Sequence, residues 1–302
     1  MSESPFFSII TPTYNRAHYL KEMIESVQAQ TFQNYEHIIV DDGSSDNTEE
    51  LVQDFSSSDG RIIYIKQENK GRSIARNVGI TSSKGQYICF LDSDDFWRPK
   101  HLEVLHQSIA TRKAPSMHVS GLTWFLEDQN KEEDVIYRPR HLYTTDTEYA
   151  IINQFAPDSV CVPREQAVKH LFNPKLYVNE DAELWGRITS EIPVITLDHY
   201  TAVLRVHDSN TSKTEESFMR ESRRVFQLQL NTPEVRSRLS EVFVKDRIRG
   251  LHELTLKHYQ SNNNRLMFVW WTMYFILRYP NNPSVLDKIK LIGRAVTGAK
   301  IS

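Results

Sequence analysis

The first hundred residues alternate short apolar runs with amphipathic segments, a pattern typical of strands and helices that alternate around a parallel sheet. The apolar runs predict strands at residues 6–11, 37–40, 62–66 and 87–91. The amphipathic segments predict helices at residues 18–30, 48–55, 73–80 and 99–110. Leu20, Ile24 and Val27 recur at helical spacing, so they predict the buried face of the first helix. We therefore expect an α/β fold.

The rest of the chain has a mixed pattern and then a helical one. A strand at 118–126, a charged turn at 127–133, a helix at 182–192 and short strands at 194–197 and 202–206 are predicted. From residue 217 onward the pattern is helical as far as two prolines, Pro280 and Pro283.

Composition narrows the class of protein. The 302 residues are 39% hydrophobic and 25% charged, so the chain can bury a core, and a net charge of −3 argues against a general nucleic-acid binder. The charge is uneven, because residues 264–302 carry six basic side chains and one acidic one. Cys89 and Cys161 lie in apolar contexts and predict neither a disulfide framework nor a zinc site. Without a signal-peptide pattern or an apolar run of 18 residues, we expect a cytoplasmic protein.

Polar clusters follow three of the predicted strands, with the sequences TPTYNR at 11–16, DDGSSD at 41–46 and DSDD at 92–95. Ligands of open α/β sheets bind beyond the carboxyl ends of strands, so these clusters predict a binding site. The first two clusters also fit turns and helix caps. The third is harder to explain as a turn, because three carboxylates in four residues repel one another unless a cation such as Mg²⁺ or Mn²⁺, which also binds diphosphate, lies between them. The chain contains neither GxGxxG nor a P-loop, which argues against a dinucleotide oxidoreductase or a P-loop NTPase.

These segments in their order resemble family-2 glycosyltransferases with the A-type nucleotide-sugar fold (GT-A). The resemblance rests on TPTYNR, VDDGSSDNT, NKGRSIARNVGI and LDSDD, is dense over residues 6–100 and continues more thinly to 214. It implies a Rossmann-like, mostly parallel central sheet flanked by helices, with a helical C-terminal extension. The expected domains are a catalytic domain at 1–214, with a donor half at 1–112 and an acceptor half at 113–214, and a helical region at 215–302.

The activity implied by the resemblance is a metal-dependent, inverting transfer of a sugar from a nucleotide diphosphate, expected to be UDP, to a hydroxyl of a glycan or lipid-linked acceptor. The implied donor-binding residues are Pro12, Tyr14, Asp42, Arg76, Asp92, Ser93, Asn210 and Ser212. Asp42 would accept a hydrogen bond from the pyrimidine ring, and Arg76 would lie near the uracil or the phosphates. Asp94 and His207 would hold Mn²⁺ or Mg²⁺, although a histidine after a strand is often only a surface residue.

The segment NEDAELW at 179–185 resembles the family's acceptor-side segment and makes Asp181 the expected general base. An acid in the first turn of a helix is also explained by the helix dipole alone. Glu180 is expected beside the acceptor, and Trp97 and Trp185 are expected to stack on sugar rings because they adjoin the motifs. Other aromatic residues are weaker candidates that fit the core equally well: Trp124, Phe125 and Tyr177.

The tail contains an apolar stretch at 266–277, LMFVWWTMYFIL, between Arg265 and Arg278. As a helix it would rise only about 18 Å, too little to cross a bilayer. One interpretation is a helix at the membrane surface, with aromatic rings at headgroup depth and residues 264–302 on the cytoplasmic face of the inner membrane. The rings concerned are Trp270, Trp271, Tyr274 and Tyr279. The alternative is a helix that packs on the protein or forms a dimer contact.

Two other functions remain open at this point. A sugar-nucleotide pyrophosphorylase has a similar sheet but needs a glycine-rich loop after the first strand, which TPTYNR lacks. An inactive nucleotide-sugar-binding or scaffold protein could keep the same donor motifs.

Overall fold

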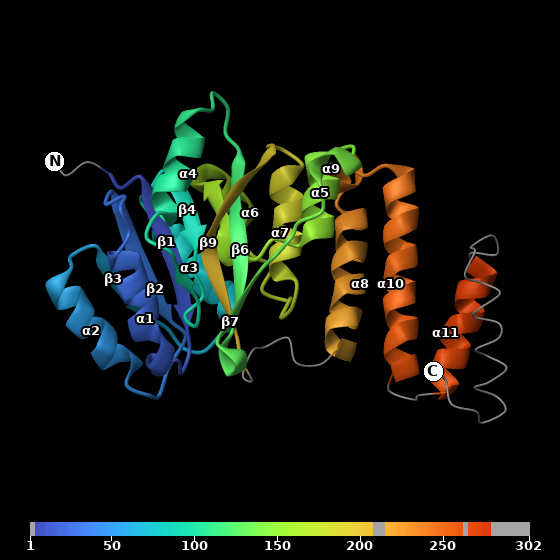
Figure 1. The fold of residues 1–302 in the computed structure, drawn as a ribbon, viewed down its shortest axis with the longest axis horizontal. Helices are drawn as coiled ribbons and strands as arrows, with labels where there is room; N and C mark the ends of the chain where they lie inside the picture. The colour runs from blue at the N-terminus through green and yellow to red at the C-terminus, as the bar shows by residue number, and fades with distance from the viewer. Residues whose placement is uncertain (1–3, 208–214, 262–264, 279–302) are drawn as a thin grey trace.

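The computed structural model describes residues 4–207, 215–261 and 265–278. Within them, nine strands form one sheet in the order β3-β2-β1-β4-β8-β6-β9-β5, and β7 pairs with β6 (Figure 1). The strands are β1 Phe7–Thr13, β2 Tyr35–Asp41, β3 Ile62–Lys66, β4 Tyr87–Phe90, β5 Phe96–Trp97, β6 Met117–Leu126, β7 Lys131–Asp134, β8 Val160–Pro163 and β9 Val194–Val206. The predicted α/β class is confirmed.

Helices cover the sheet and extend from one end of it (Figure 1). The helices are α1 Ala17–Gln28, α2 Thr48–Ser58, α3 Arg72–Ser82, α4 His101–Ala110, α5 Asp146–Asn153, α6 Arg164–His170, α7 Glu180–Thr189, α8 Glu215–Asn231, α9 Pro233–Arg236, α10 Glu241–Ser261 and α11 Arg265–Arg278. The predicted helical pattern after residue 217 is therefore confirmed as far as α11.

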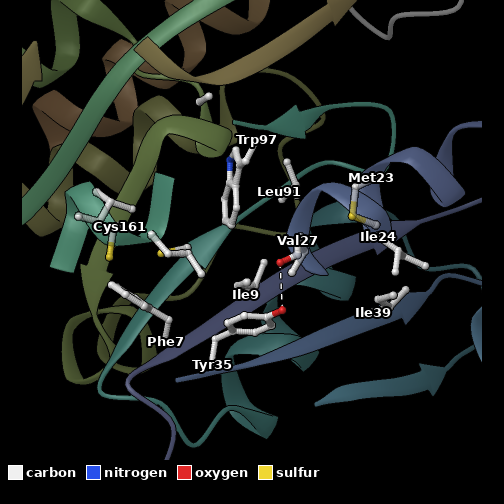
Figure 2. Packing of buried hydrophobic residues seen from close by; sticks show 14 of the residues in the cluster. Phe7, Ile9, Met23, Ile24, Val27, Tyr35, Ile39, Leu91, Trp97 and Cys161 are labelled. Atoms are coloured by element: carbon white, nitrogen blue, oxygen red, sulfur yellow. Dashed lines mark hydrogen bonds between the residues drawn. The ribbon is translucent and has the colours of Figure 1, made fainter. Parts of the chain in front are cut away.

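The first four predicted strands form the parallel part of the sheet, because β1 pairs with both β2 and β4, and β2 pairs with β3. Leu20, Ile24 and Val27 of α1 are buried in the core as predicted, and Figure 2 shows the Tyr35 hydroxyl donating to the Val27 carbonyl over 3.0 Å. Burial of each large aliphatic side chain stabilises the fold by roughly 1.5–3 kcal/mol. Because these strands are parallel, the loops that follow them meet at one edge.

The rest of the sheet is mixed. β8 runs antiparallel to β4 and β6, whereas β6 and β9 are parallel. The two short strands predicted at 194–197 and 202–206 are one strand, β9, whose pairing with β6 shifts register beside Gly121. A Cβ on Gly121 would lie 2.8 Å from Cγ of Tyr200, so the close approach of the two strands requires glycine there.

The C-terminal helices stack outward in chain order: α8 packs on α7, α10 on α8, and α11 on α10 (Figure 1). Phe268 and Thr272 of α11 are buried, and the guanidinium of Arg223 in α8 lies 4.1 Å from the centre of the Trp271 ring. Trp270 and Tyr274 are exposed, with their rings stacked at 5.9 Å. Within the described ranges, no helix is both long and apolar enough to cross a membrane. Tyr279, the remaining predicted interfacial residue, lies outside the described residues.

Candidate active site

The three polar clusters predicted at strand ends meet at one edge of the sheet. They line a pocket of about 200 Å³, here called the strand-end pocket. Its lining residues are Pro12, Thr13, Tyr14, Arg16, Asp42, Arg72, Asp92, Ser93 and Asp94. The structure therefore brings together the six donor-side and metal-side residues predicted from β1, β2 and β4.

Asp42 is held in a fixed position at the end of β2. One of its carboxylate oxygens accepts from the side chain of Gln67 at 2.6 Å and from the backbone N–H of Lys70 at 2.9 Å. The other oxygen accepts from the N–H of Gly71 at 2.7 Å, and Gly71 has a φ of +91°, in the region that favours glycine. The loop after β3 thus orients a carboxylate that is only 4% exposed.

Asp94 and His207 lie side by side although 113 residues separate them along the chain. The imidazole Nε2 of His207 is 3.1 Å from Oδ2 of Asp94, and Nε of Arg16 is 4.0 Å from the same oxygen. β9 runs beside β6 and ends at Val206, so the next residue, His207, lies against Asp94, which lines the strand-end pocket. A carboxylate oxygen and an imidazole nitrogen are donors that Mn²⁺ accepts well.

Asp158 is a site residue that sequence reasoning missed. Its Oδ1 accepts from the backbone N–H of Asp92 at 2.7 Å, and oxygens of Asp92, Asp95 and Asp158 lie within 4.8 Å of one another. Burial, and then the charge of Asp92, raise the pKa of Asp158 to about 7. Burial, and then the charge of Asp158, raise the pKa of Asp95 well above its usual range. Asp158 lies in a short turn, Pro157–Ser159, with no spacing or composition that marks it in the sequence.

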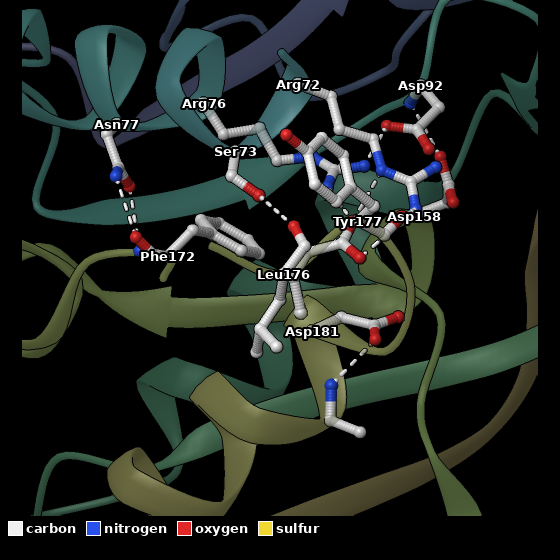
Figure 3. Close-up of polar contacts among 12 residues, drawn as sticks. Arg72, Ser73, Arg76, Asn77, Asp92, Asp158, Phe172, Leu176, Tyr177 and Asp181 are labelled. Atoms are coloured by element: carbon white, nitrogen blue, oxygen red, sulfur yellow. Dashed lines mark hydrogen bonds and ion pairs between the residues drawn. The ribbon is translucent and has the colours of Figure 1, made fainter. Parts of the chain in front are cut away.

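Two arginines of α3 hold the start of α7 (Figure 3). Arg76 is 1% exposed and donates to Asp92 at 2.6 Å and to Glu180 at 2.9 Å. Arg72 pairs with Glu180 at 2.7 Å and donates to the carbonyl of Tyr177 at 2.6 Å. Burial lowers the pKa of Arg76, but the carboxylates of Asp92 and Glu180 outweigh it and raise the pKa overall.

This network bears on two predictions. Arg76 was expected beside the uracil or the phosphates, and Glu180 beside the acceptor sugar. Both terminal nitrogens of Arg76 bind carboxylates, and Glu180 is 3% exposed with both of its oxygens bound to arginine. The two side chains are therefore engaged with each other and with arginine or aspartate neighbours, and they tie α3 to α7. Both also line the α7 pocket described next, so their roles toward the donor and the acceptor stay predictions.

Asp181 lies at the start of α7 and lines a second, larger pocket of about 410 Å³, here called the α7 pocket. The two pockets share Arg72, Asp92 and Asp94 as lining residues. Oδ1 of Asp181 accepts from the N–H of Ala182 at 2.7 Å. Burial, and next the charge of Glu180, raise the pKa of Asp181 to about 7, while the two arginines act in the opposite direction.

The prediction that Trp97 and Trp185 stack on sugars is wrong. Both rings are buried, and their indole N–H groups donate to backbone carbonyls, that of Trp97 to Asp158 at 2.8 Å and that of Trp185 to Phe155 at 2.9 Å. Trp124, a weaker candidate in the sequence, is 44% exposed and lines the α7 pocket.

Asn210 and Ser212, predicted to contact the phosphates, lie outside the described residues. Their assignment stays a prediction.

Comparison with known proteins identifies the family. A model of glycosyl transferase family 2 matches residues 8–163, which include the strand-end motifs and Asp158. The chain belongs to glycosyl transferase family 2. The match confirms the resemblance seen in the motifs, and it includes all four motifs on which the resemblance rests.

Curated members of the family are similar over part of their length. Glycosyltransferase GlyG of Streptococcus pneumoniae is 42% identical over 112 residues, which are 37% of this chain and 37% of GlyG, so the chain spans well under two thirds of that relative. The putative teichuronic acid biosynthesis glycosyltransferase TuaG of Bacillus subtilis is 32% identical over 184 residues, 60% of this chain and 71% of TuaG.

Solved structures share the GT-A fold over nearly the whole chain. S. aureus TarS 1–349 in complex with UDP-GlcNAc has a TM-score of 0.65 at 18% identity and covers 97% of this chain and 92% of its own. The mannosyltransferase PcManGT from Pyrobaculum calidifontis, in complex with GDP-Man and Mn²⁺, has a TM-score of 0.64 at 15% identity and covers 98% of this chain and 81% of its own. At these identities the likeness establishes the fold.

Proposed function

We propose that the protein is a metal-dependent inverting glycosyltransferase that moves a sugar from a UDP-sugar to a hydroxyl of a glycan or lipid-linked acceptor. The observation that carries the proposal is the junction of the two pockets. The strand-end pocket holds Asp42 and Asp94, the α7 pocket holds Asp181, and the two share Asp92 and Asp94. A donor in the first pocket would therefore present its sugar toward the carboxylate in the second.

In this proposal the loops after β1, β2 and β4 bind the donor. Pro12 and Tyr14 would lie against the nucleobase, the fixed carboxylate of Asp42 would accept from its ring N–H, and Asp92 and Ser93 would face the ribose or sugar. Support comes from the pocket that these residues line together and from the UDP-GlcNAc complex of the structurally similar TarS. UDP is the proposed nucleotide.

Asp94 and His207 would hold Mn²⁺ or Mg²⁺. The fit is supported by their separation of 3.1 Å, by their oxygen and nitrogen donors, and by the Mn²⁺ in the similar structure of PcManGT. When bound, the ion neutralises charge on the departing diphosphate. Arg16, 4.0 Å from Asp94, adds a fixed positive charge at the same end of the pocket.

Asp181 is the proposed general base. It takes the proton from the acceptor hydroxyl as that oxygen attacks the anomeric carbon from the face opposite the diphosphate, which inverts the configuration. A base works best when its pKa is near the working pH, and burial raises the pKa of Asp181 to about 7. Arg72 and Arg76 hold Glu180 and so fix the backbone that carries Asp181.

The proposed setting is cell-surface polysaccharide synthesis at the cytoplasmic face of the membrane. The name of TuaG, which refers to teichuronic acid biosynthesis, supports the first part. The exposed stripe Met267, Trp270, Met273 and Tyr274 on α11 supports a membrane-surface helix formed within residues 264–302. In a vesicle flotation assay the double variant Trp270→Ala/Tyr274→Ala should lose binding to anionic vesicles, and equal flotation would contradict membrane association.

The proposed domain boundaries are consistent with the positions of the two pockets and of α7. Residues 1–112 form the donor half and 113–214 the acceptor half of one catalytic domain at 1–214, and 215–302 form the helical region. α7, from the acceptor half, contacts both α5 and α8 and so joins the catalytic domain to the helical region.

The decisive experiment is a panel of nucleotide sugars screened for turnover with Mn²⁺ present. We expect release of UDP from at least one UDP-sugar and its loss on addition of EDTA. Binding of UDP without turnover of any donor would favour a binding or scaffold protein. Formation of a nucleotide sugar from UTP and a sugar 1-phosphate would favour a pyrophosphorylase.

A further inference from the structure

Arg205 is a buried arginine near the end of β9, two residues before His207, and its side chain is 7% exposed. Its guanidinium carbon lies 5.1–5.5 Å from the centres of three aromatic rings, those of Tyr19, Phe96 and Phe125. Aromatic faces attract a cation, most strongly where water is excluded. The rings come from α1, β5 and β6, so three elements of the fold hold this side chain in one place.

Two carboxylates bind the terminal nitrogens of the same guanidinium. One nitrogen donates to Glu127 at 3.0 Å and the other to Glu22 at 2.6 Å. The hydroxyl of Tyr19 donates to the second oxygen of Glu127 at 2.9 Å, and the Tyr19 ring lies 5.0 Å from the ring of His207. The surroundings of Arg205 therefore extend to the imidazole expected to bind metal.

The remaining contacts of Arg205 are with the turn after β4 that carries Asp94 and Asp95. Nε of Arg205 donates to the backbone carbonyl of Asp94 at 3.1 Å, and the backbone N–H of Arg205 donates to Oδ1 of Asp95 at 2.7 Å. Nε2 of His207 is 3.1 Å from the carboxylate of Asp94. The end of β9 thus contacts this turn at the Asp94 backbone, the Asp95 carboxylate and the Asp94 carboxylate.

We propose that Arg205 is a positioning residue that holds the backbone of Asp94 so that its carboxylate stays beside His207. Arg205 is absent from the described lining of both pockets, so it acts through Asp94 and not on a ligand directly. The proposal rests on the metal role proposed above for Asp94 and His207. Groups that orient metal ligands typically change metal affinity 10–100-fold when they are replaced.

The test measures Mn²⁺ binding by the full-length protein with equimolar UDP, using EPR to count the free ion. Arg205→Met keeps an apolar stem between the rings but loses every N–H of the guanidinium, so it should weaken Mn²⁺ binding about tenfold. The backbone N–H that binds Asp95 survives in this variant, so the change isolates the side chain. The matched control is Arg98→Met, which removes an arginine that is 40% exposed, pairs with Glu132 at 2.7 Å and lines neither pocket. The control should bind Mn²⁺ like wild type.

Arg205→Lys separates positioning from stability. Lysine keeps the charge among the rings but has a single nitrogen, which cannot reproduce the fork that binds Asp94 and both glutamates. This variant should therefore unfold closer to the wild-type temperature than Arg205→Met does, yet bind Mn²⁺ at least about threefold more weakly than wild type. If Arg205→Met does not fold, Arg205→Lys decides the question.

Wild-type Mn²⁺ affinity in a folded Arg205 variant would overturn the proposal, even if the variant is less stable, because Arg205 would then only stabilise the fold. UDP binding without metal should change by less than about threefold in both variants, and an equal loss of UDP and Mn²⁺ affinity would instead indicate a general distortion of the pocket. If wild-type protein binds no Mn²⁺, the metal role in the proposed function fails. If wild type and both Arg205 variants bind Mn²⁺ equally, the positioning proposal alone fails.

Discussion

Replacing Asp181 with asparagine removes the proposed base while keeping the size of the side chain at the start of α7. Loss of a general base lowers the rate by about 10²–10⁴-fold. The assay is the initial rate of UDP release from the preferred UDP-sugar with saturating acceptor and Mn²⁺. The matched control is Asp146→Asn, at the first residue of α5 and outside both pockets, which should leave the rate unchanged.

The pH dependence of wild-type transfer follows from the same carboxyl group. Burial raises the pKa of Asp181 from 3.8 to about 7, and a base must be ionised to act. We therefore expect kcat/KM to fall about tenfold for each pH unit below 7, since this parameter reports on the free enzyme. A profile that stays flat from pH 8 to pH 5 would refute the assignment of the base or the environment inferred for it.

The stability of the Asp181→Asn variant tests the raised pKa of Asp181 independently of activity. Because the pKa is raised in the folded protein, the folded state keeps a proton that the unfolded chain has released between about pH 4 and pH 7, so stability falls as the pH rises through this window. The full shift corresponds to a ceiling of about 4 kcal/mol. The variant should therefore unfold at a higher temperature than wild type at pH 8, with a difference that shrinks toward pH 5. Equal destabilisation at both pH values would mean that the carboxylate mainly stabilises the helix terminus.

Three further substitutions test other parts of the structure. His207→Ala removes the imidazole beside Asp94, so the Mn²⁺ concentration for half-maximal turnover should rise at least about tenfold, and an unchanged titration would exclude a ligand role. Arg76→Met leaves the buried carboxylate of Glu180 with Arg72 alone and takes the arginine partner from Asp92, so it should cost about 3 kcal/mol in urea unfolding. A cost below about 1 kcal/mol would contradict the bridging role. Gly85→Ala would place a Cβ 2.6 Å from the backbone nitrogen of Ser8, so it should lower stability by about 1–3 kcal/mol in thermal unfolding. Its control is Gly60→Ala, whose Cβ would have no atom within 4 Å and which should therefore unfold close to the wild-type temperature.

The first 112 residues were predictable because most of their strands and helices carry their periodicity in long segments. β1 to β4 follow continuous apolar runs, and each helix predicted in this part of the chain is present within a few residues of its expected bounds. The short strands β5 and β8 were less predictable. β5 has two residues and β8 has four, too few to show a period, and both depend on partners far along the chain. β9 was predicted as two strands because exposed polar residues, Asp198 and His199, interrupt its apolar pattern.

The site could likewise be predicted only in part, because the sequence indicates which loops meet but not where each side chain points. The strand-end loops and the approach of His207 to Asp94 were predicted, since motif order fixes which loops share a sheet edge. Proximity to a motif does not fix the direction of a ring, however. Trp97 directly follows the acidic cluster, but its ring stacks on His101 at 4.1 Å and its indole N–H holds the backbone of Asp158. Trp97 therefore supports the position of Asp158 from within the core.

The buried ion pairs give α3 and α7 a fixed relation before any ligand binds. Arg76 comes from α3, and its guanidinium joins Asp92, just after β4, to Glu180, the first residue of α7. Removing one partner of such a pair leaves a buried charge without compensation, so the bridge resists separation of the two elements. Asp181 follows Glu180 directly, and the bridge therefore sets the position of the proposed base relative to the carboxylate that would face the donor. A base positioned by buried charges needs no large closing motion to reach its place, which is the preorganisation that proton transfer in a single displacement requires.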